Sequence, residues 1–317
     1  MTEPGGGFAI PALAGIFLVA TLLLGGCATP QMAALDARWP AQLVARVELA
    51  DVPFFAQEEH QCGPAALATV AGAAGVALTP EALTEQVYLP GREASLSLEL
   101  LAASRRNALL PYPLRPRMED LMQEVAAGHP VLVLQNLAFA WYPLWHYAVV
   151  IGFDRERNVL VLRSGRTQRL EMSLFTFERT WARADHWAML ALAPGQLPAT
   201  AQAATYIETV AALERVNPQA AQQAYAAALL LWPQERALLL GVGNSAYALG
   251  QPDTAVKAYR SATEQHPDFA DAWNNLAQVL LDTGQHNAAA QAIEKAVVIG
   301  GTRLARYLEL QRAIENK

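Results

Sequence analysis

The sequence has few cysteines and few charged residues. Only Cys27 and Cys62 occur in 317 residues, and Asp, Glu, Lys and Arg together make up 16%. The net charge of −6 comes without a cluster of Lys and Arg, which argues against nucleic acid as a main partner because phosphate binding needs clustered positive charge. The six His are scattered and there is no HExxH, CxxC or nucleotide-binding loop, so we expect neither a metal ion nor another cofactor.

An apolar run lies near the N-terminus. Residues 10–24 are about 15 residues long, which is short for a membrane-spanning helix and typical of a signal peptide. The sequence Leu24-Gly25-Gly26-Cys27 then resembles the lipobox of bacterial lipoproteins, in which the Cys is diacylated and becomes the new N-terminus. The resemblance implies a signal peptide over residues 1–27, lipidation of Cys27 and a tether over residues 28–46.

The location follows from the same resemblance. No Asp follows the Cys, which implies an outer-membrane lipoprotein that faces the periplasm. The alternative is an uncleaved N-terminal anchor, because the first eight residues contain no Lys or Arg.

Lipidation of Cys27 would leave Cys62 without a disulfide partner. Cys62 lies in the stretch Gln61-Cys62-Gly63-Pro64-Ala65-Ala66-Leu67-Ala68, and residues 65–75 are predicted to form a buried helix. The unpaired N–H groups at a helix start stabilise a thiolate, which is the nucleophilic form, and Pro64 fits the first turn. The alternative is an inert, buried cysteine at the helix start.

The order of the patterns between residues 47 and 193 predicts an α+β domain. One helix is expected over residues 97–107 and ends at Asn107 in the left-handed conformation. A second is expected over residues 118–127 and is followed by Gly128, which ends it. Strands then dominate, and an antiparallel sheet that follows helices indicates the α+β class. The strands are expected at 130–135, 145–153, 159–163, 168–172 and 187–193, with a turn at 154–158 and a helix near 173–181.

His146 lies at the start of one of these predicted strands. A single Cys and a His in this order match the pattern of a nucleophilic Cys–His pair. The imidazole would take the thiol proton, the thiolate would attack a carbonyl to give a thioester, and the imidazolium would protonate the leaving amine. The alternative is a structural, hydrogen-bonded histidine.

These residues resemble the papain-like cysteine peptidases that cut double-glycine leader peptides in bacteriocin exporters, and their stand-alone relatives. The resemblance implies that Cys62 is the nucleophile, that His146 is the general base, and that Gln57 donates to the oxyanion hole beside the backbone N–H of Cys62. Gln57 stands five residues before the Cys, where the family more often has six, so Gln61 is a second candidate. The matching segments are 52–57, 61–68, 128–133 and 146–154.

The third member of the family's triad is an Asp or Asn roughly sixteen positions beyond the His, where this sequence reads Leu162-Arg163-Ser164-Gly165. Asp154 would lie some 26 Å from His146 along an extended strand and is expected in the hairpin turn. Ser164 is the candidate acceptor for the imidazole N–H, and Asp185 is an alternative from elsewhere in the fold. A Cys–His dyad needs such a group less than a serine enzyme does, because the thiol is more acidic.

A boundary is expected at residues 194–201, which contain Pro and Gly and no charge, and a helical pattern of period 34 covers residues 202–317. The pattern resembles tetratricopeptide repeats, which implies clear units at 236–269 and 270–302, a degenerate unit at 202–235 and a capping helix at 304–314. An unrelated helical bundle is the alternative. The residues in register are Ala221, Ala255 and Ala289; Tyr225, Tyr259 and Ile293; Ala228, Ala262 and Ala296; Pro233 and Pro267; and Gly250 and Gly284.

The sequence therefore predicts a lipid-anchored periplasmic cysteine peptidase or amide hydrolase, with helical repeats that bind a peptide or protein. The missing Asp favours an alternative, a peptidase-like domain that holds peptides without cutting them within a scaffold lipoprotein. A purely structural outer-membrane lipoprotein is a third possibility.

Overall fold

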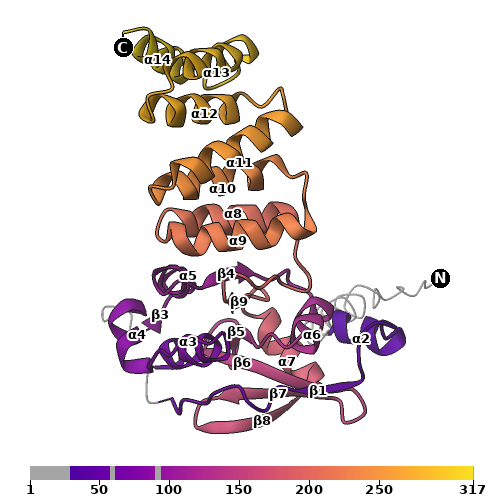
Figure 1. Ribbon diagram of the computed structural model, residues 1–317. Coiled ribbons are helices and arrows are strands. Elements are labelled where there is room, and N and C mark those ends of the chain that lie inside the picture. The colour runs from indigo at the N-terminus through magenta and orange to yellow at the C-terminus, as the bar shows by residue number, and fades with distance from the viewer. Residues whose placement is uncertain (1–28, 58–60, 90–93, 317) are drawn as a thin grey trace, which may run out of the picture.

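The computed structural model describes residues 29–57, 61–89 and 94–316. The apolar run and Cys27 lie outside the described residues, so the predicted signal peptide and lipidation site stay predictions. Within the described residues, no helix has the length and apolar character needed to cross a membrane. A domain of helices and strands comes first, and a stack of helices stands on it (Figure 1).

The sheet of the first domain is antiparallel, and seven strands form it within the described residues. β1 (Arg46–Glu48) pairs with β6, where a Cβ on Gly152 would lie 2.6 Å from the carbonyl oxygen of Val47, so only glycine fits there. The other strands follow in the spatial order β4 (Leu110–Pro113), β9 (Ala188–Leu192), β5 (Val131–Asn136), β6 (Trp145–Asp154), β7 (Val159–Ser164) and β8 (Thr167–Ser173). A separate small sheet pairs β2 (Tyr88–Leu89) with β3 (Ala94–Ser95).

Each face of the sheet has its own core, because successive side chains along a strand point to opposite faces. On one face, Tyr147 and Val149 of β6 pack with α3 (Cys62–Ala73), α4 (Pro80–Val87) and α5 (Ser97–Arg106). On the other face, Ala148 and Val150 pack with α6 (Met118–Ala126) and α7 (Leu174–Ala182). Helices and an antiparallel sheet in this arrangement confirm the predicted α+β class.

Gly128 has a φ of 92° and follows α6, as the sequence predicted. The prediction for the end of α5 was wrong in one detail. Asn107 has a φ of −97°, and the left-handed residue is Ala108, with a φ of 57°. The Asn107 side chain instead donates to the carbonyl oxygen of Ala103 at 2.8 Å, which satisfies one of the last carbonyl groups of the helix.

The segment predicted as a tether over residues 28–46 is instead part of the domain from residue 30 onward. It contains α2 (Pro30–Ala37), which buries Met32 and Leu35 in the core. The backbone N–H groups of Gln31 and Met32 donate to the carboxylate of Glu178 on α7 at 2.9 and 2.7 Å. The first N–H groups of a helix have no partner within it, so Glu178 satisfies two of them and fixes α2 to the domain.

Seven helices follow in the described residues, as three stacked pairs and a last single helix (Figure 1). The Ala, Tyr and Ile residues in register at a period of 34 are at most 2% exposed, which confirms that they form the contact between paired helices. Gly243 is needed because a Cβ there would lie 2.2 Å from the ring of Tyr259. The helices are α8 (Ala203–Glu214), α9 (Pro218–Leu231), α10 (Arg236–Ala248), α11 (Pro252–Gln265), α12 (Ala270–Asp282), α13 (His286–Ile299) and α14 (Leu304–Glu315).

The junction predicted as a linker at residues 194–201 is fixed by a buried carboxylate. Glu124 on α6 accepts hydrogen bonds from the N–H and hydroxyl of Thr200 at 2.7 and 2.6 Å, and from the N–H of Ala199 at 3.0 Å. Burial acts to raise the pKa of Glu124, but bonds from His129, Thr200 and Ala199 outweigh burial and lower it.

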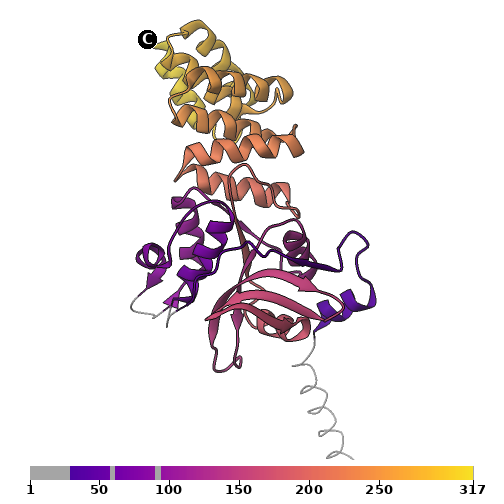
Figure 2. The same ribbon diagram turned by 60° about the horizontal axis from the view of Figure 1, so that its bottom comes forward.

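The junction also shares a core with the sheet. The ring centroids of Tyr112 on β4 and Tyr206 on α8 lie 6.4 Å apart, and α8 packs along β4. The helical stack therefore rests directly on the edge of the sheet, as two views of the molecule show (Figures 1 and 2).

Replacing Glu124 with Gln should lower the free energy of unfolding by about 2–3 kcal/mol, because it removes the charge that accepts four hydrogen bonds. Urea denaturation followed by circular dichroism measures this. Glu156→Gln, in the turn after β6, is the control, since Glu156 is exposed and its loss should change stability by less than about 0.5 kcal/mol.

The effect of Glu124→Gln should depend on pH. The pKa of Glu124 is lowered in the folded state, so its contribution is present above the ordinary value of 4.5 and is lost as the pH falls through the lower folded value. Equal stability losses for the Glu124 and Glu156 variants at pH 7 would contradict this account of the junction.

Candidate active site

Cys62 is the first residue of α3, and it is a partly exposed free thiol. Nine of the twelve residues of α3 are buried, which explains why this stretch of the sequence shows no amphipathic pattern. Gln61 precedes the helix, and its side chain makes no capping hydrogen bond. The unpaired N–H groups and the positive end of the helix dipole therefore face the region of the thiol.

His146 and Ser164 meet at the ends of two neighbouring strands. His146 is the second residue of β6, and its Nε2 lies 2.8 Å from Oγ of Ser164, the last residue of β7. In the tautomer that carries its proton on Nε2, Ser164 accepts that N–H, and Nδ1 is the basic nitrogen. Burial lowers the pKa of His146 and so favours the neutral imidazole, which is the form that can take a proton.

Gln57 reaches the same end of the sheet from the segment that precedes α3. Its backbone N–H donates to the carbonyl oxygen of Gly165 at 3.0 Å, next to Ser164. Its side-chain Nε2 lies 3.4 Å from the carbonyl oxygen of Tyr147, the residue after His146. The amide of Gln57 carries a second N–H, which is the kind of donor that an oxyanion hole needs.

Tyr147 connects the strand that carries His146 with the environment of Cys62. Its hydroxyl lies 3.0 Å from Oγ of Ser97, and its ring meets Trp187 edge-on at 5.7 Å. Burial raises the pKa of Tyr147 to about 12; the bond with Ser97 acts to lower it, and the nearby Cys62 to raise it. Tyr147 and Cys62 also pack in the same apolar cluster, on the face of the sheet covered by α3.

Asp154 and Asp185 are not the groups that bond Nε2 of His146. Asp154 ends β6, accepts the N–H of Arg157 at 3.0 Å and lies 3.6 Å from Nε of Arg46, which agrees with its predicted place in the turn. Asp185 lies in the turn after α7 with a φ of 51°, where its charge acts on His186. Ser164 is therefore the candidate that the structure brings to the imidazole.

Arg163 supports the site and was missed in the sequence. It is 5% exposed, and its guanidinium donates to the carbonyl oxygens of Val52 at 2.9 and 3.2 Å, Ala50 at 3.0 Å and Gln168 at 2.6 Å. These bonds hold the backbone that leads to Gln57 against β7. A buried Arg almost always has hydrogen-bond partners, so the presence of Arg163 in an otherwise apolar predicted strand could have indicated a structural role.

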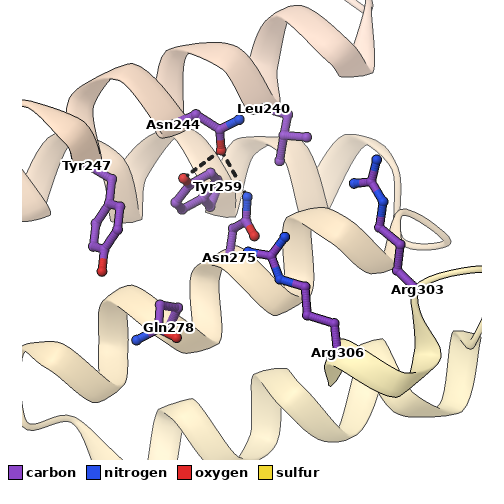
Figure 3. Close-up of a pocket in the computed structure, with 8 residues that line it drawn as sticks. All are labelled: Leu240, Asn244, Tyr247, Tyr259, Asn275, Gln278, Arg303 and Arg306. Atoms are coloured by element: carbon purple, nitrogen blue, oxygen red, sulfur yellow. Dashed lines mark hydrogen bonds between the residues drawn. The ribbon is translucent and has the colours of Figure 1, made fainter. Parts of the chain in front are cut away.

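The helical stack contains a second candidate site, a pocket of about 260 Å³ (Figure 3). Oδ1 of Asn244 accepts hydrogen bonds from the hydroxyl of Tyr259 and from Nδ2 of Asn275, both at 2.9 Å. Arg306, in the first turn of α14, extends toward this network, and Arg303, just before α14, donates to the carboxylate of Asp271 at 2.9 Å. The lining residues are Leu240, Asn244, Tyr247, Tyr259, Asn275, Gln278, Arg303 and Arg306.

An α+β domain with Cys62 at a helix start and His146 at a strand start, followed by paired helices, defines a peptidase-like protein with protein-binding repeats. More particularly, residues 49–189 match the model of the Peptidase_C39 like family, and residues 243–303 match a tetratricopeptide repeat model. The chain therefore combines a C39-like peptidase domain with tetratricopeptide repeats, which confirms both resemblances. No curated protein matches this chain.

Several solved structures are similar to parts of the chain. A C39-like peptidase from Bacillus anthracis is 17% identical with a TM-score of 0.40, over 46% of this chain and 97% of that one. The type III secretion translocator chaperone SycD of Yersinia enterocolitica is 18% identical with a TM-score of 0.34, over 36% of this chain and 83% of that one. The Sgt2 TPR domain of Aspergillus fumigatus is 26% identical with a TM-score of 0.32, over 36% and 79%.

The substitution Ser164→Asp should raise the pKa of His146 by about 1–2 units, because a carboxylate beside Nε2 favours the imidazolium. Burial lowers this pKa from the ordinary value of 6.5 in the native protein, so the two effects oppose each other. NMR titration of the His146 ring measures the shift, with His146→Gln to assign its signal.

Ser173→Asp is the matched control for this titration, because Ser173 is exposed and ends β8 at the opposite end of the sheet. It should leave the pKa of His146 unchanged. A Ser164→Asp variant with the native pKa would show that residue 164 does not act on the imidazole.

Proposed function

We propose that this protein is a cysteine peptidase or amide hydrolase in which Cys62 is the nucleophile and His146 is the general base. The observation that carries the proposal is the 2.8 Å contact between Nε2 of His146 and Ser164. It holds the ring in one orientation and leaves Nδ1 as the nitrogen that can take the thiol proton. The helix start at Cys62 favours the resulting thiolate.

In the proposed reaction, Nδ1 of His146 takes the proton of Cys62 and the sulfur attacks the carbonyl carbon of the substrate. The electron pair of the C=O bond moves to the oxygen, and Gln57 and the backbone N–H of Cys62 donate to that oxyanion. The imidazolium then gives its proton to the leaving amine as the C–N bond breaks. Water, deprotonated by the same His146, hydrolyses the thioester and restores the thiol.

Ser164 also favours a second candidate function. A neutral hydroxyl stabilises the imidazolium less than the carboxylate of the related peptidases, and burial acts against the imidazolium in the same direction. A domain that holds a peptide and cuts it slowly, or not at all, fits this combination. The reactivity of the single thiol distinguishes the two functions.

Iodoacetamide labelling of Cys62 in a Cys27→Ser background measures that reactivity, since Cys62 is then the only cysteine. At pH 7 an enzyme should react at least about tenfold faster than its His146→Ala variant, because the base that ionises the thiol is lost. His186→Ala is the control and should keep the native rate. If Cys62 in the His146→Ala variant is alkylated at the native rate, the second candidate function, a domain that holds a peptide without cutting it, is the better description.

We further propose that the protein is anchored by lipid at Cys27 to the outer membrane and faces the periplasm. The lipobox-like residues 24–27 support this. Only Ala28 and Thr29 separate Cys27 from α2, which is bound to α6 and α7, so a lipid at Cys27 would hold the peptidase domain close to the bilayer.

Cys27→Ser should abolish processing of the precursor, whereas Cys62→Ser, as the matched control, should be processed normally. Mass spectrometry of the membrane fraction with and without globomycin measures the acylated and unprocessed forms. Normal processing of the Cys27→Ser chain would refute lipidation at this residue.

The repeats would bind a segment of a peptide or protein partner in the proposed arrangement. The pocket around Asn244 supports this, because the amide and guanidinium groups that line it offer several hydrogen-bond donors to a backbone or side chain. Their bound partner would be either the substrate itself or a protein that brings the substrate to Cys62.

A further inference from the structure

The connection between β5 and β6 exposes an unusual amount of apolar surface. We name residues 137–145 the aromatic loop. It contains no charged residue, and six of its nine side chains are large and apolar. Their exposed fractions are 40% for Leu137, 63% for Phe139, 81% for Trp141, 71% for Tyr142, 59% for Leu144 and 52% for Trp145. Contiguous exposed patches of this kind usually mark a contact site.

The aromatic loop has a defined conformation that does not depend on burying its rings. Asn136, which is 1% exposed, accepts the N–H groups of Ala138 and Leu144 at 3.0 Å each, and its Nδ2 donates to the carbonyl oxygen of Phe139 at 3.2 Å. The guanidinium of Arg183 binds the backbone carbonyl of Asn136 at 3.0 and 3.2 Å. A buried polar framework therefore holds the apolar side chains out in solvent.

Two of the rings are also arranged against each other. The rings of Phe139 and Trp141 are stacked with centroids 5.5 Å apart and planes at 10°, and Trp141 lies 6.1 Å from Tyr142. The stack presents a flat aromatic surface, which suits contact with another apolar group.

The aromatic loop adjoins the candidate active site. Its last residue, Trp145, directly precedes His146, and Asn136 and Trp145 are paired across β5 and β6. Both ends of the loop therefore leave the sheet beside His146, at the end where Ser164 and Gln57 also lie. The exposed apolar surface therefore begins at the residue next to His146.

We propose that the aromatic loop is a substrate-binding surface that takes an apolar side chain of a peptide, next to the bond that Cys62 attacks. The absence of charge in the loop favours an aromatic or aliphatic side chain. The occupant is a peptide and not a lipid surface, because a bilayer on these rings would also cover His146. The proposal rests on the proposed function and adds a specificity to it.

The test uses the full-length Cys62→Ala protein in phosphatidylcholine nanodiscs, which can bind peptides but cannot cut them. Two pools of seven-residue peptides, randomised except for a central Phe in one and a central Ser in the other, are passed over the immobilised protein. Mass spectrometry measures the amount retained. The Phe pool should be retained at least about tenfold more than the Ser pool, as burial of one aromatic side chain allows.

The variant Phe139→Ser/Trp141→Ser should reduce this preference to less than about threefold. Leu230→Ser is the matched control, since Leu230 is 87% exposed on α9 among the repeats, and it should keep the full preference. The variant Phe139→Leu/Trp141→Tyr keeps apolar surface in the loop and should retain most of the preference for the Phe pool. Far-ultraviolet circular dichroism checks that each variant is folded.

Three results would overturn the proposal: no preference for the Phe pool in the starting protein, the same preference in the double Ser variant, or quenching of Trp141 by brominated lipid in the nanodiscs. The labelling of Cys62 separates this proposal from the proposed function. A reactive thiol without a loop-dependent preference refutes the aromatic loop as the binding surface. A loop-dependent preference with an unreactive thiol refutes the peptidase and keeps the binding surface.

Discussion

The register of β6 against β5 and β7 is the constraint on which the candidate site depends. β6 is bonded to β5, β7 and β1, and this pairing places His146 opposite Gln135 and brings Ser164 to the imidazole. A shift of one residue would turn every side chain of the strand to the other face and would separate His146 from Ser164. The buried runs on both faces of β6 therefore fix the orientation of the base as well as the core.

Three buried charged side chains attach segments that have little apolar pattern of their own. Glu178 binds the start of α2, Arg163 binds the backbone that leads to Gln57, and Glu124 binds the junction before α8. Within the attached segments, each partner of these groups is a backbone N–H or carbonyl, or a short hydroxyl, so nothing in the sequence of the bound segment identifies the contact. Hydrogen bonds to a charged group are stronger than bonds between neutral groups, so these attachments are strong.

Periodicity explains which parts of the fold could be predicted. The units expected from the period of 34 begin at residues 236 and 270, where α10 and α12 begin, because the Ala and Tyr residues that repeat are the ones buried between paired helices. The strands β5 to β9 were also expected within a few residues of their observed bounds. The prediction of a tether over residues 28–46 was wrong because α2 is bound by Glu178. Glu178 lies 146 residues from Met32 in the sequence, and no local pattern indicates such a contact.

The candidate site was predicted in the same uneven way. Cys62, His146 and Gln57 stand in recognisable motifs, so the sequence alone could name them as candidates. Ser164 could only be one of several candidates, since its contact with His146 depends on how β6 and β7 pair. The exposure of the aromatic loop and the burial of Arg163 could not be predicted, because both are properties of the folded chain.

The junction at Glu124 has a consequence for geometry. Because Ala199 and Thr200 are bound to α6 and α8 packs on β4, the repeats cannot swing freely relative to the sheet. These contacts limit how far the distance between the pocket at Asn244 and the thiol of Cys62 can change. In a peptide bound both in this pocket and at Cys62, the number of residues between the two points would therefore determine which bond is attacked.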